Sequence, residues 1–468
     1  MPAPQAVLDA IDSRFDATCD ELVALTRIPG VSAAGFDPAE LVRSADAVAA
    51  LFSDAGLDDV EVLRIGDAHP YVVAEKRGPG AGFPTVLIYA HHDVQPPGRL
   101  DRWLTPAFEP SVREDGRLYG RGVVDDKAGI LLHVAALRAW LAVGEPLPIN
   151  VKLIVEGEEE IGSGHLVEFL RQHRERLAAD VLVLSDTQNL DTGIPSLTTS
   201  LRGIVQVDVT VRVLDHPLHS GMWGGPLPDA ATALSRLLGR LVDDAGRCAV
   251  PELDADVPAP SRAERAEIAA LPYDEATFRR DAGILDGVPL VDEAGRSPYE
   301  QLWFRPSIAV TALEAVPFAT AANQLVDEAR ARIGVRVAPG QDPERVARCV
   351  VDFVTTAPPF GAQVEAHVVA KVPGWRTRAE GPAYVAARRA LAAGFGRDAV
   401  SIGCGGTIPF VAPFGEVMGG IPQLLLGLED PPCNAHGENE SLDLDDFRKA
   451  AYASAHLLSE LARLHESG

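Results

Sequence analysis

The first 200 residues alternate between strand-like and helix-like hydrophobic patterns. Three largely apolar runs have the length of strands, and they cover residues 86–90, 149–155 and 181–184. Such runs are typical of strands that are buried on both faces. Helical patterns cover residues 5–26, 127–141 and 164–177. This alternation predicts an open α/β sheet with helices on both faces.

The pattern changes at about residue 200. Polar and apolar residues alternate strictly over 205–213, and residues 329–337 and 363–369 look similar. Period-two alternation indicates strands with one face in solvent. Two predicted helices, 229–241 and 343–355, lie among these strands. The middle of the chain is therefore predicted to be a smaller α+β domain.

The ends of the middle section give the predicted domain boundaries. Its segment 251–291 is rich in Pro, Ala and charge and predicts an insertion of helices and loops. After residue 375 the strand–helix alternation returns, ending with a helix over 445–465. A chain of 468 residues is long enough for two domains. We therefore predict a sheet domain split into residues 1–198 and 375–468, with a second domain inserted at 199–374.

Composition and charge exclude several classes of protein. The net charge of −25 disfavours nucleic acid and anionic membranes as partners, since both are polyanions. No run reaches the roughly 18–20 apolar residues of a membrane span, and the first twenty residues lack the pattern of a signal peptide. The five scattered cysteines argue against a disulfide framework. We expect a cytoplasmic protein.

Histidine and acidic residues follow the predicted buried strands. His91 and Asp93 come directly after the first strand, Glu159 and Glu160 lie in the acidic run after the second, and the third ends at Asp186. Further candidates are Asp125, before the helix over 127–141, and His436 in a late loop. Ligands of open α/β sheets bind at the carboxyl ends of strands, so we expect these groups to share one cleft.

Clustered carboxylates repel one another unless cations compensate them. Imidazole and carboxylate are ligands for zinc or manganese. Two such cations about 3.5–4 Å apart generate a nucleophile at neutral pH and polarise a carbonyl. An isolated acidic run is more often a solvated loop, but several groups here follow buried strands. The residues thus predict a dinuclear metallohydrolase.

Seven motifs occur in an order that resembles the carnosinase/aminoacylase superfamily of co-catalytic zinc peptidases. They are YAHHDVQPP, LYGRGVVDDKAG, EGEEEIGSG, VLSD, HPLHSGMWGG, CGGTIPF and CNAHGENE. The resemblance implies a split phosphorylase/hydrolase-like catalytic domain with a mostly parallel sheet, and an inserted ferredoxin-like lid or dimerisation domain. It also implies a homodimer with two divalent metal ions, zinc first and manganese or cobalt as alternatives.

The resemblance implies a role for each metal-site residue. His91 and Asp186 would bind one metal, Glu160 and His436 the other, and Asp125 would bridge them. Two more residues would act around the metals: Asp93 would accept a hydrogen bond from the imidazole of His91, and Glu159 would be the general base. The peptide bond after Asp125 is expected to be cis.

The resemblance also implies substrate contacts on the inserted domain. His219 would stabilise the developing oxyanion, and in dimeric members this histidine comes from the partner subunit. Arg336 would bind the free carboxylate of the substrate, and Asn323 its carbonyl. Thr407, preceded by Gly406, corresponds to a hydroxyl residue near that carboxylate.

The HxDVQP form of the first motif and the long inserted domain favour the dipeptidase branch of the family. The predicted substrate is a dipeptide or similar short peptide with a free C-terminal carboxylate. A deacylase or carbamoylase acting on N-acyl amino acids is the first alternative, and a non-catalytic binding protein on the same scaffold is the second.

Overall fold

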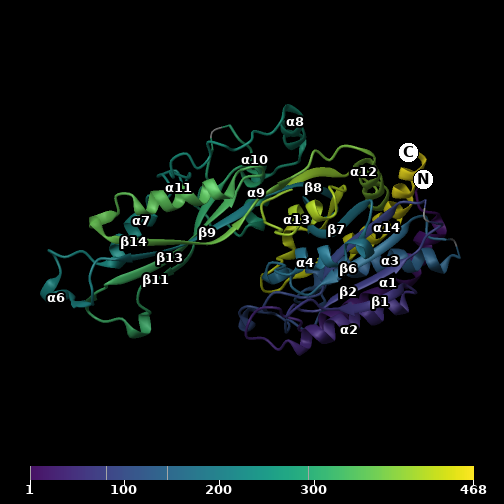
Figure 1. The fold of residues 1–468 in the computed structure, drawn as a ribbon, viewed down its shortest axis with the longest axis horizontal. Helices are drawn as coiled ribbons and strands as arrows, with labels where there is room; N and C mark the ends of the chain where they lie inside the picture. Colours follow the sequence, from purple (N-terminus) through teal and green to yellow (C-terminus); the bar gives the residue numbers. More distant parts are fainter. Residues whose placement is uncertain (1, 81, 145, 294, 468) are drawn as a thin grey trace. The chain divides into compact units, whose positions relative to one another are not determined.

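A computed structural model describes residues 2–80, 82–144, 146–293 and 295–467 of the chain (Figure 1). Its contacts form two compact units. The first comprises Met1–Thr199, Arg378–Ile402 and Phe410–Gly468, and the second comprises Ser200–Thr377 and Gly403–Pro409.

Residues 403–409 are the main difference from the predicted boundaries, which assign them to the sheet domain. They belong to the second unit because glycines in this segment allow close packing against it. A Cβ atom at Gly403 would lie 2.4 Å from Cβ of Trp303. The carbonyl oxygen of Gly405 also accepts a hydrogen bond of 3.0 Å from Nε of Arg202.

The first unit is built on a mixed sheet. Its strands are β1 (Asp58–Leu63), β2 (Tyr71–Lys76), β3 (Thr85–His91), β6 (Asn150–Glu156), β7 (Val181–Gln188), β8 (Ser196–Leu201), β16 (Val400–Cys404) and β17 (Gln423–Glu429), and the last two residues of β8 and of β16 belong to the second unit. The order is β1-β2-β6-β3-β7-β17-β8, with β16 beside β8. The four central strands β6, β3, β7 and β17 are parallel, whereas the outer pairs are antiparallel. The prediction of a mostly parallel sheet thus holds for its centre.

A three-stranded antiparallel sheet also belongs to the first unit. It consists of β4 (Ser111–Val112), β5 (Arg117–Tyr119) and β18 (Ser441–Asp443), in the order β18-β5-β4. The helices of this unit are α1 (Gln5–Thr26), α2 (Ala39–Asp54), α3 (Ala128–Ala142), α4 (Leu166–Gln172), α5 (Arg174–Leu177), α12 (Pro382–Phe395), α13 (Val411–Val417) and α14 (Leu444–Leu461).

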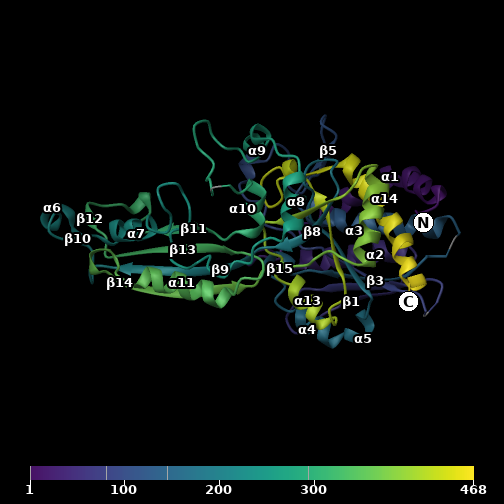
Figure 2. The same cartoon turned by 90° about the horizontal axis from the view of Figure 1, so that it is seen from above.

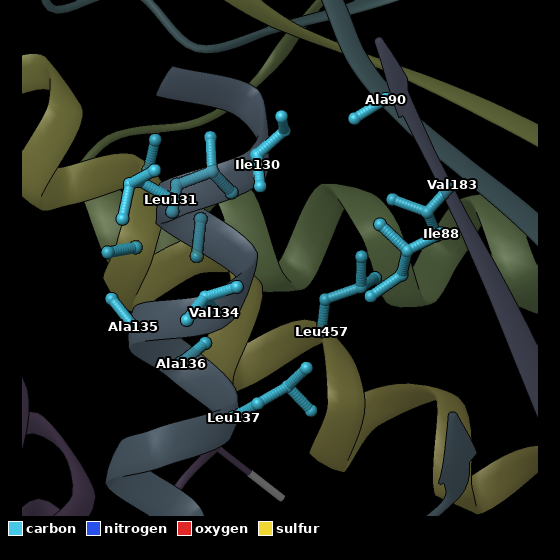
Figure 3. Packing of buried hydrophobic residues seen from close by; sticks show 14 of the residues in the cluster. Ile88, Ala90, Ile130, Leu131, Val134, Ala135, Ala136, Leu137, Val183 and Leu457 are labelled. Atoms are coloured by element: carbon cyan, nitrogen blue, oxygen red, sulfur yellow. The ribbon is translucent and has the colours of Figure 1, made fainter. Parts of the chain in front are cut away.

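Helices cover the central strands on both faces. On one face, Leu457 of α14 lies beside Ile88 of β3 and Val183 of β7, next to the apolar side chains of α3 (Figure 3). On the other face, the ring centroid of Tyr89 lies 4.3 Å from that of Phe410, directly before α13. Burial on both faces explains why these strands are apolar without alternation.

The second unit contains a ferredoxin-like domain, as predicted. Its elements follow the order β9 (Gly203–Arg212), α7 (Ala230–Leu238), β11 (Ser307–Glu314), β13 (Glu328–Val337), α11 (Pro343–Thr355) and β14 (Gln363–Val372). The strands form an antiparallel sheet in the order β11-β13-β9-β14. Alternate side chains of β9 and β13 are buried in a core with α7 and α11, which explains their period-two pattern.

Shorter elements complete the second unit. They are β10 (Leu218–His219), α6 (Ser220–Trp223), α8 (Arg262–Ala270), α9 (Glu275–Asp281), α10 (Pro298–Phe304), β12 (Gln324–Leu325) and β15 (Trp375–Arg376). Helices α8 and α9 lie within the segment 251–291, where the composition predicted an insertion of helices and loops.

Most predicted elements agree with the structure, and the differences have local causes. Helices α1 and α11 have the predicted bounds, but the helix predicted over 164–177 is broken into α4 and α5 at His173, whose φ and ψ of −105° and 18° are not helical. The edge strand β1 was not predicted, because its side chains are mostly exposed and form no apolar run. Within the described ranges, no helix is both long and apolar enough to cross a membrane.

Candidate metal centre and substrate-binding residues

Adjacent parallel strands and the segment before α3 position three of the predicted metal ligands. His91 is the last residue of β3, and Asp186 lies near the end of the neighbouring strand β7. Asp125 lies in Val123–Lys127, a kinked segment that leads directly into α3 and in which Asp125 and Asp126 have non-helical φ and ψ. The peptide bond Asp125–Asp126 is cis, which confirms the expectation from the resemblance.

The carboxylate of Asp125 lies between two imidazoles. Its Oδ1 is 3.0 Å from Nε2 of His91, and its Oδ2 is 2.9 Å from Nε2 of His436. A second carboxylate lies near each imidazole: Oδ2 of Asp186 is 3.7 Å from His91 Nε2, and Oε2 of Glu160 is 3.3 Å from His436 Nε2. The structure thus brings together all five residues predicted to bind metal.

Asp93 holds the backbone of Glu159 and Glu160 and contacts the imidazole of His91. Its Oδ1 accepts a hydrogen bond of 3.2 Å from the backbone N–H of Glu159, and its Oδ2 accepts one of 3.1 Å from that of Glu160. Nδ1 of His91 lies 3.0 Å from the carbonyl oxygen of Asp93 and 3.4 Å from Oδ1. The predicted contact with His91 is present, although the closer atom is the carbonyl oxygen. The carboxylate also fixes the loop that carries Glu159 and Glu160.

Burial and mutual repulsion shift the pKa values of these acids. Burial raises the pKa of Asp186 and of Glu160, and the charge of Asp125 adds to both shifts. Burial, together with the charges of Glu160, Asp125 and Asp93, raises the pKa of Glu159 to about 8, although His91 acts in the opposite direction. Asp125 differs, because its hydrogen bonds with His436 and His91 outweigh burial and lower its pKa.

This donor set fits two divalent cations. Three carboxylates in one buried cluster lose hydration and repel one another, and positive charge between them removes that penalty. One atom each of His91, Asp125 and Glu160 lie within 4.8 Å of one another, which is a spacing that one ion can span. Imidazole and carboxylate together suit zinc or manganese. We take the cluster as a candidate dinuclear metal centre.

Three further residues belong to this cluster, although no metal-site role was predicted for any of them from the sequence. Gln95 donates from Nε2 to Oε2 of Glu160 at 2.8 Å and from its backbone N–H to Oε1 at 3.1 Å. Asp126 and Glu429 each have a carboxylate oxygen within 4.8 Å of cluster atoms. Glu429 ends the parallel strand β17, so the rule that selected His91 could have found it. Gln95 gave no such signal, because an amide is not a typical zinc ligand.

The predicted carboxylate-binding residues lie together in the second unit. Nη1 of Arg336, on β13, donates a hydrogen bond of 2.9 Å to Oγ1 of Thr407. That hydroxyl donates in turn to the carbonyl oxygen of Arg202 at 2.7 Å. Gly406 is next to Thr407, and its N–H donates to Sγ of Cys404 at 3.3 Å.

His219 lies on β10, and Asn323 directly precedes β12, which pairs with β10. Figure 2 shows β10 and β12 at the end of the second unit away from β15. β10 pairs with β12, and the backbone N–H of Ser220 donates a hydrogen bond of 2.9 Å to the carbonyl oxygen of Asn323. Both His219 and Asn323 are exposed. They lie past Glu328, the first residue of β13, whereas Arg336 is the next-to-last residue of that strand. The eight residue steps from Glu328 to Arg336 cover about 27 Å in an extended strand. The structure therefore does not bring these two residues to Arg336 within one chain.

The central strands of the sheet are parallel, and imidazoles and carboxylates at their ends surround a shared aspartate. This combination is typical of a metal-dependent hydrolase. The chain belongs to peptidase family M20/M25/M40, whose model matches residues 87–460. It is therefore a metallopeptidase.

Known proteins of this kind resemble the chain over most of its length. It is 33% identical over 413 residues to the cysteinylglycine-S-conjugate dipeptidase of Corynebacterium striatum, a match that covers 88% of each chain. It is 29% identical to the Beta-Ala-His dipeptidase of Homo sapiens, over 85% of this chain and 78% of that one. The crystal structure of human carnosine dipeptidase 1 matches with a TM-score of 0.85 and 26% identity, over 99% of this chain and 100% of that one.

Proposed function

We propose that the protein is a dipeptidase that hydrolyses the peptide bond of dipeptides with a free C-terminal carboxylate, using two divalent cations. The observation that carries the proposal is the position of Asp125, whose two carboxylate oxygens face His91 and His436 at 3.0 and 2.9 Å. Two relatives support the choice of substrate, because the proteins of Corynebacterium striatum and Homo sapiens that match along most of the chain are both named as dipeptidases.

In this proposal each ligand has a defined place. His91 and Asp186 would hold one cation, Glu160 and His436 the other, and Asp125 would bind both. When bound, the cations lower the pKa of a coordinated water and polarise the carbonyl of the substrate. Zinc is the proposed native metal, with manganese and cobalt as substitutes.

Glu159 would move the proton in this reaction. Its carboxylate takes a proton from the attacking water and passes it to the nitrogen of the leaving amine, so that the C–N bond breaks as a neutral amine departs. Burial and the neighbouring carboxylates raise the pKa of Glu159, and two cations bound beside it would lower that pKa again, so that the carboxylate is ionised and can accept the proton. The hydrogen bond from its N–H to Asp93 keeps its backbone in place for this transfer.

Arg336 would anchor the substrate through its free carboxylate. A guanidinium group meets a carboxylate with two parallel hydrogen bonds. Thr407, whose Oγ1 accepts a hydrogen bond of 2.9 Å from Nη1 of Arg336, holds the arginine in place.

The proposed assembly is a cytoplasmic homodimer in which His219 and Asn323 serve the site of the partner subunit. A dipeptide extends roughly 7 Å. It cannot span the length of β13 that separates these residues from Arg336 in one chain. The exposed edge strand β11, with Leu313 62% exposed, offers a surface for pairing between subunits.

Mixed dimers test this assignment of His219. We expect His219→Ala and Glu159→Gln subunits to be inactive separately. When they are co-expressed, half of the dimers are mixed, and one site of each mixed dimer has an intact Glu159 with an intact His219 from the other chain. Activity should return to about a quarter of the wild-type value. If no activity returns although mixed dimers form, both residues act in the same chain.

A substrate panel tests the proposed function. The protein is stripped with a chelator, reloaded with zinc, manganese or cobalt, and assayed with Cys-Gly, β-Ala-His, the C-terminal amides of both dipeptides, and N-acetyl and N-succinyl amino acids. We expect metal-dependent cleavage of dipeptides. The amides should lose at least about tenfold in kcat/KM, since hydrogen bonds to a charged group contribute roughly 1.5–3 kcal/mol.

The other outcomes separate the alternatives. Cleavage of only the N-acyl compounds would support a deacylase with the same chemistry. No turnover of any compound by protein that holds two metal ions would support a binding protein on this scaffold.

A further inference from the structure

A buried ion pair, Arg121–Glu440, lies directly behind the candidate metal centre. Arg121 follows β5, and Glu440 precedes β18, which pairs with β5 through Tyr119 and Ser441. Nη1 of Arg121 is 2.5 Å from Oε2 of Glu440, and each side chain is only 1% exposed. Two charges without access to water must be satisfied by protein groups, so their remaining hydrogen bonds show what the pair holds.

The carboxylate of Glu440 binds the backbone that leads into Asp125. Oε2 accepts a hydrogen bond of 3.0 Å from the N–H of Gly122, and Oε1 accepts bonds of 3.1 Å from Val124 and 3.4 Å from Asp125 itself. Three backbone donors within residues 122–125 bind one carboxylate and fix the course of this segment. The peptide plane of Asp125 is thereby set relative to Glu440.

The guanidinium of Arg121 binds the loop that carries His436. Its Nη2 donates hydrogen bonds of 3.0 Å to the carbonyl oxygens of His436 and of Gly437. His436 has a φ of 63°, a left-handed conformation that is unfavourable for residues other than glycine. The two hydrogen bonds from Arg121 help to hold the loop in this conformation.

The ion pair therefore connects two ligand-bearing segments that are far apart in sequence. We propose that Arg121 and Glu440 are positioning residues that fix the spacing between Asp125 and His436, and so set the affinity of the cation held by His436 and Glu160. This inference rests on the proposed dinuclear site but not on the identity of the substrate. Residues behind metal ligands typically change metal affinity or activity by about 10–100-fold.

A second buried ion pair in the same region provides a matched control. Arg117 of β5 donates to both carboxylate oxygens of Asp430, at 2.7 and 2.6 Å, and from Nε to Oγ of Ser441 at 2.9 Å. The Arg117–Asp430 pair is also buried. The guanidinium of Arg117 contacts Asp430 and Ser441, whereas that of Arg121 contacts Glu440 and the loop of His436. Changes at Arg117 report the cost of disturbing a buried ion pair without moving a ligand.

The test is a titration of chelator-stripped protein with Co²⁺, followed by calorimetry and by the visible spectrum of the bound ion. Arg121→Lys keeps the positive charge but cannot contact Glu440 and two carbonyl oxygens together. Glu440→Gln keeps the shape but loses an acceptor. For both variants we expect one of two Co²⁺ sites to weaken by about 10–100-fold, with a much smaller change at the other. Arg117→Lys should bind both ions as the wild type does, even if its Tm falls by a similar amount.

The proposal is overturned if both variants bind two Co²⁺ ions with wild-type affinity, or if Arg117→Lys loses affinity equally. It is also overturned if neither variant folds, which would assign the pair to fold stability, or if the wild type binds no Co²⁺. Since no substrate is used, a wild type that binds two ions but cleaves no dipeptide would refute the proposed function and leave this inference standing.

Discussion

Replacement of Asp125 by alanine is expected to remove both metal ions and to reduce activity to background. The side chain supplies the only carboxylate that the structure places within 3.0 Å of both His91 and His436 among the described residues. Without it, Asp186 remains beside Nε2 of His91 and Glu160 beside Nε2 of His436. Removing one partner from a buried charged cluster costs about 3–5 kcal/mol, which corresponds to roughly 10²–10⁴-fold in metal affinity.

The measurement for Asp125 is metal content after dialysis, together with the rate of dipeptide cleavage. Asp446→Ala is a suitable control, because Asp446 is also a buried carboxylate but accepts a hydrogen bond from the backbone N–H of Gly193, away from the imidazoles. We expect this control to lower the Tm and keep two ions per chain. An Asp125→Ala protein that still holds two ions would contradict the bridging role.

Replacement of Glu159 by glutamine is expected to lower kcat by about 10²–10⁴-fold while both metal ions remain bound. The carboxamide side chain has nearly the same shape as the carboxylate. The backbone N–H of residue 159 therefore keeps its hydrogen bond to Asp93. The carboxamide cannot accept a proton from water, however, and the proton has no route to the leaving amine. KM should change little, because the change affects the reaction and not the binding of the substrate.

The neighbouring residue Glu158 is the matched control. Its carboxylate accepts a hydrogen bond from the N–H of His69 and contacts the imidazole of His165, so it holds structure and does not face the metal ligands. Glu158→Gln should keep kcat within a few-fold of the wild type. An equal loss of kcat in both variants, or an active Glu159→Gln enzyme, would remove Glu159 from the role of general base.

Much of the metal centre followed from local sequence patterns. An apolar run such as 86–90 must be a buried strand, and the residue that follows it lies at the edge of the sheet where ligands bind. His91 and Asp186 were found in this way, and the motifs placed Asp125, Glu160 and His436. The strict alternation in β9 and β13 likewise predicted one-sided burial.

Contacts between distant segments could not be predicted in this way. Gln95 and Glu160 form three hydrogen bonds although they are 65 residues apart, and Arg121 and Glu440 pair across 319 residues. Glu440 and Gln95 are polar residues in loops, where hydrophobic periodicity gives no information about orientation. Their roles depend on which strands become neighbours.

The sequence by itself determined the class of fold and the metal-binding residue types, because burial of strands and helices imposes periods that can be read locally. Only the tertiary structure decided that Arg121 pairs with Glu440 behind Asp125, and that His219 and Asn323 lie at the opposite end of their unit from Arg336. Both facts depend on strand order and loop packing. These result from burying apolar surface across the whole chain, a long-range property that no local pattern records.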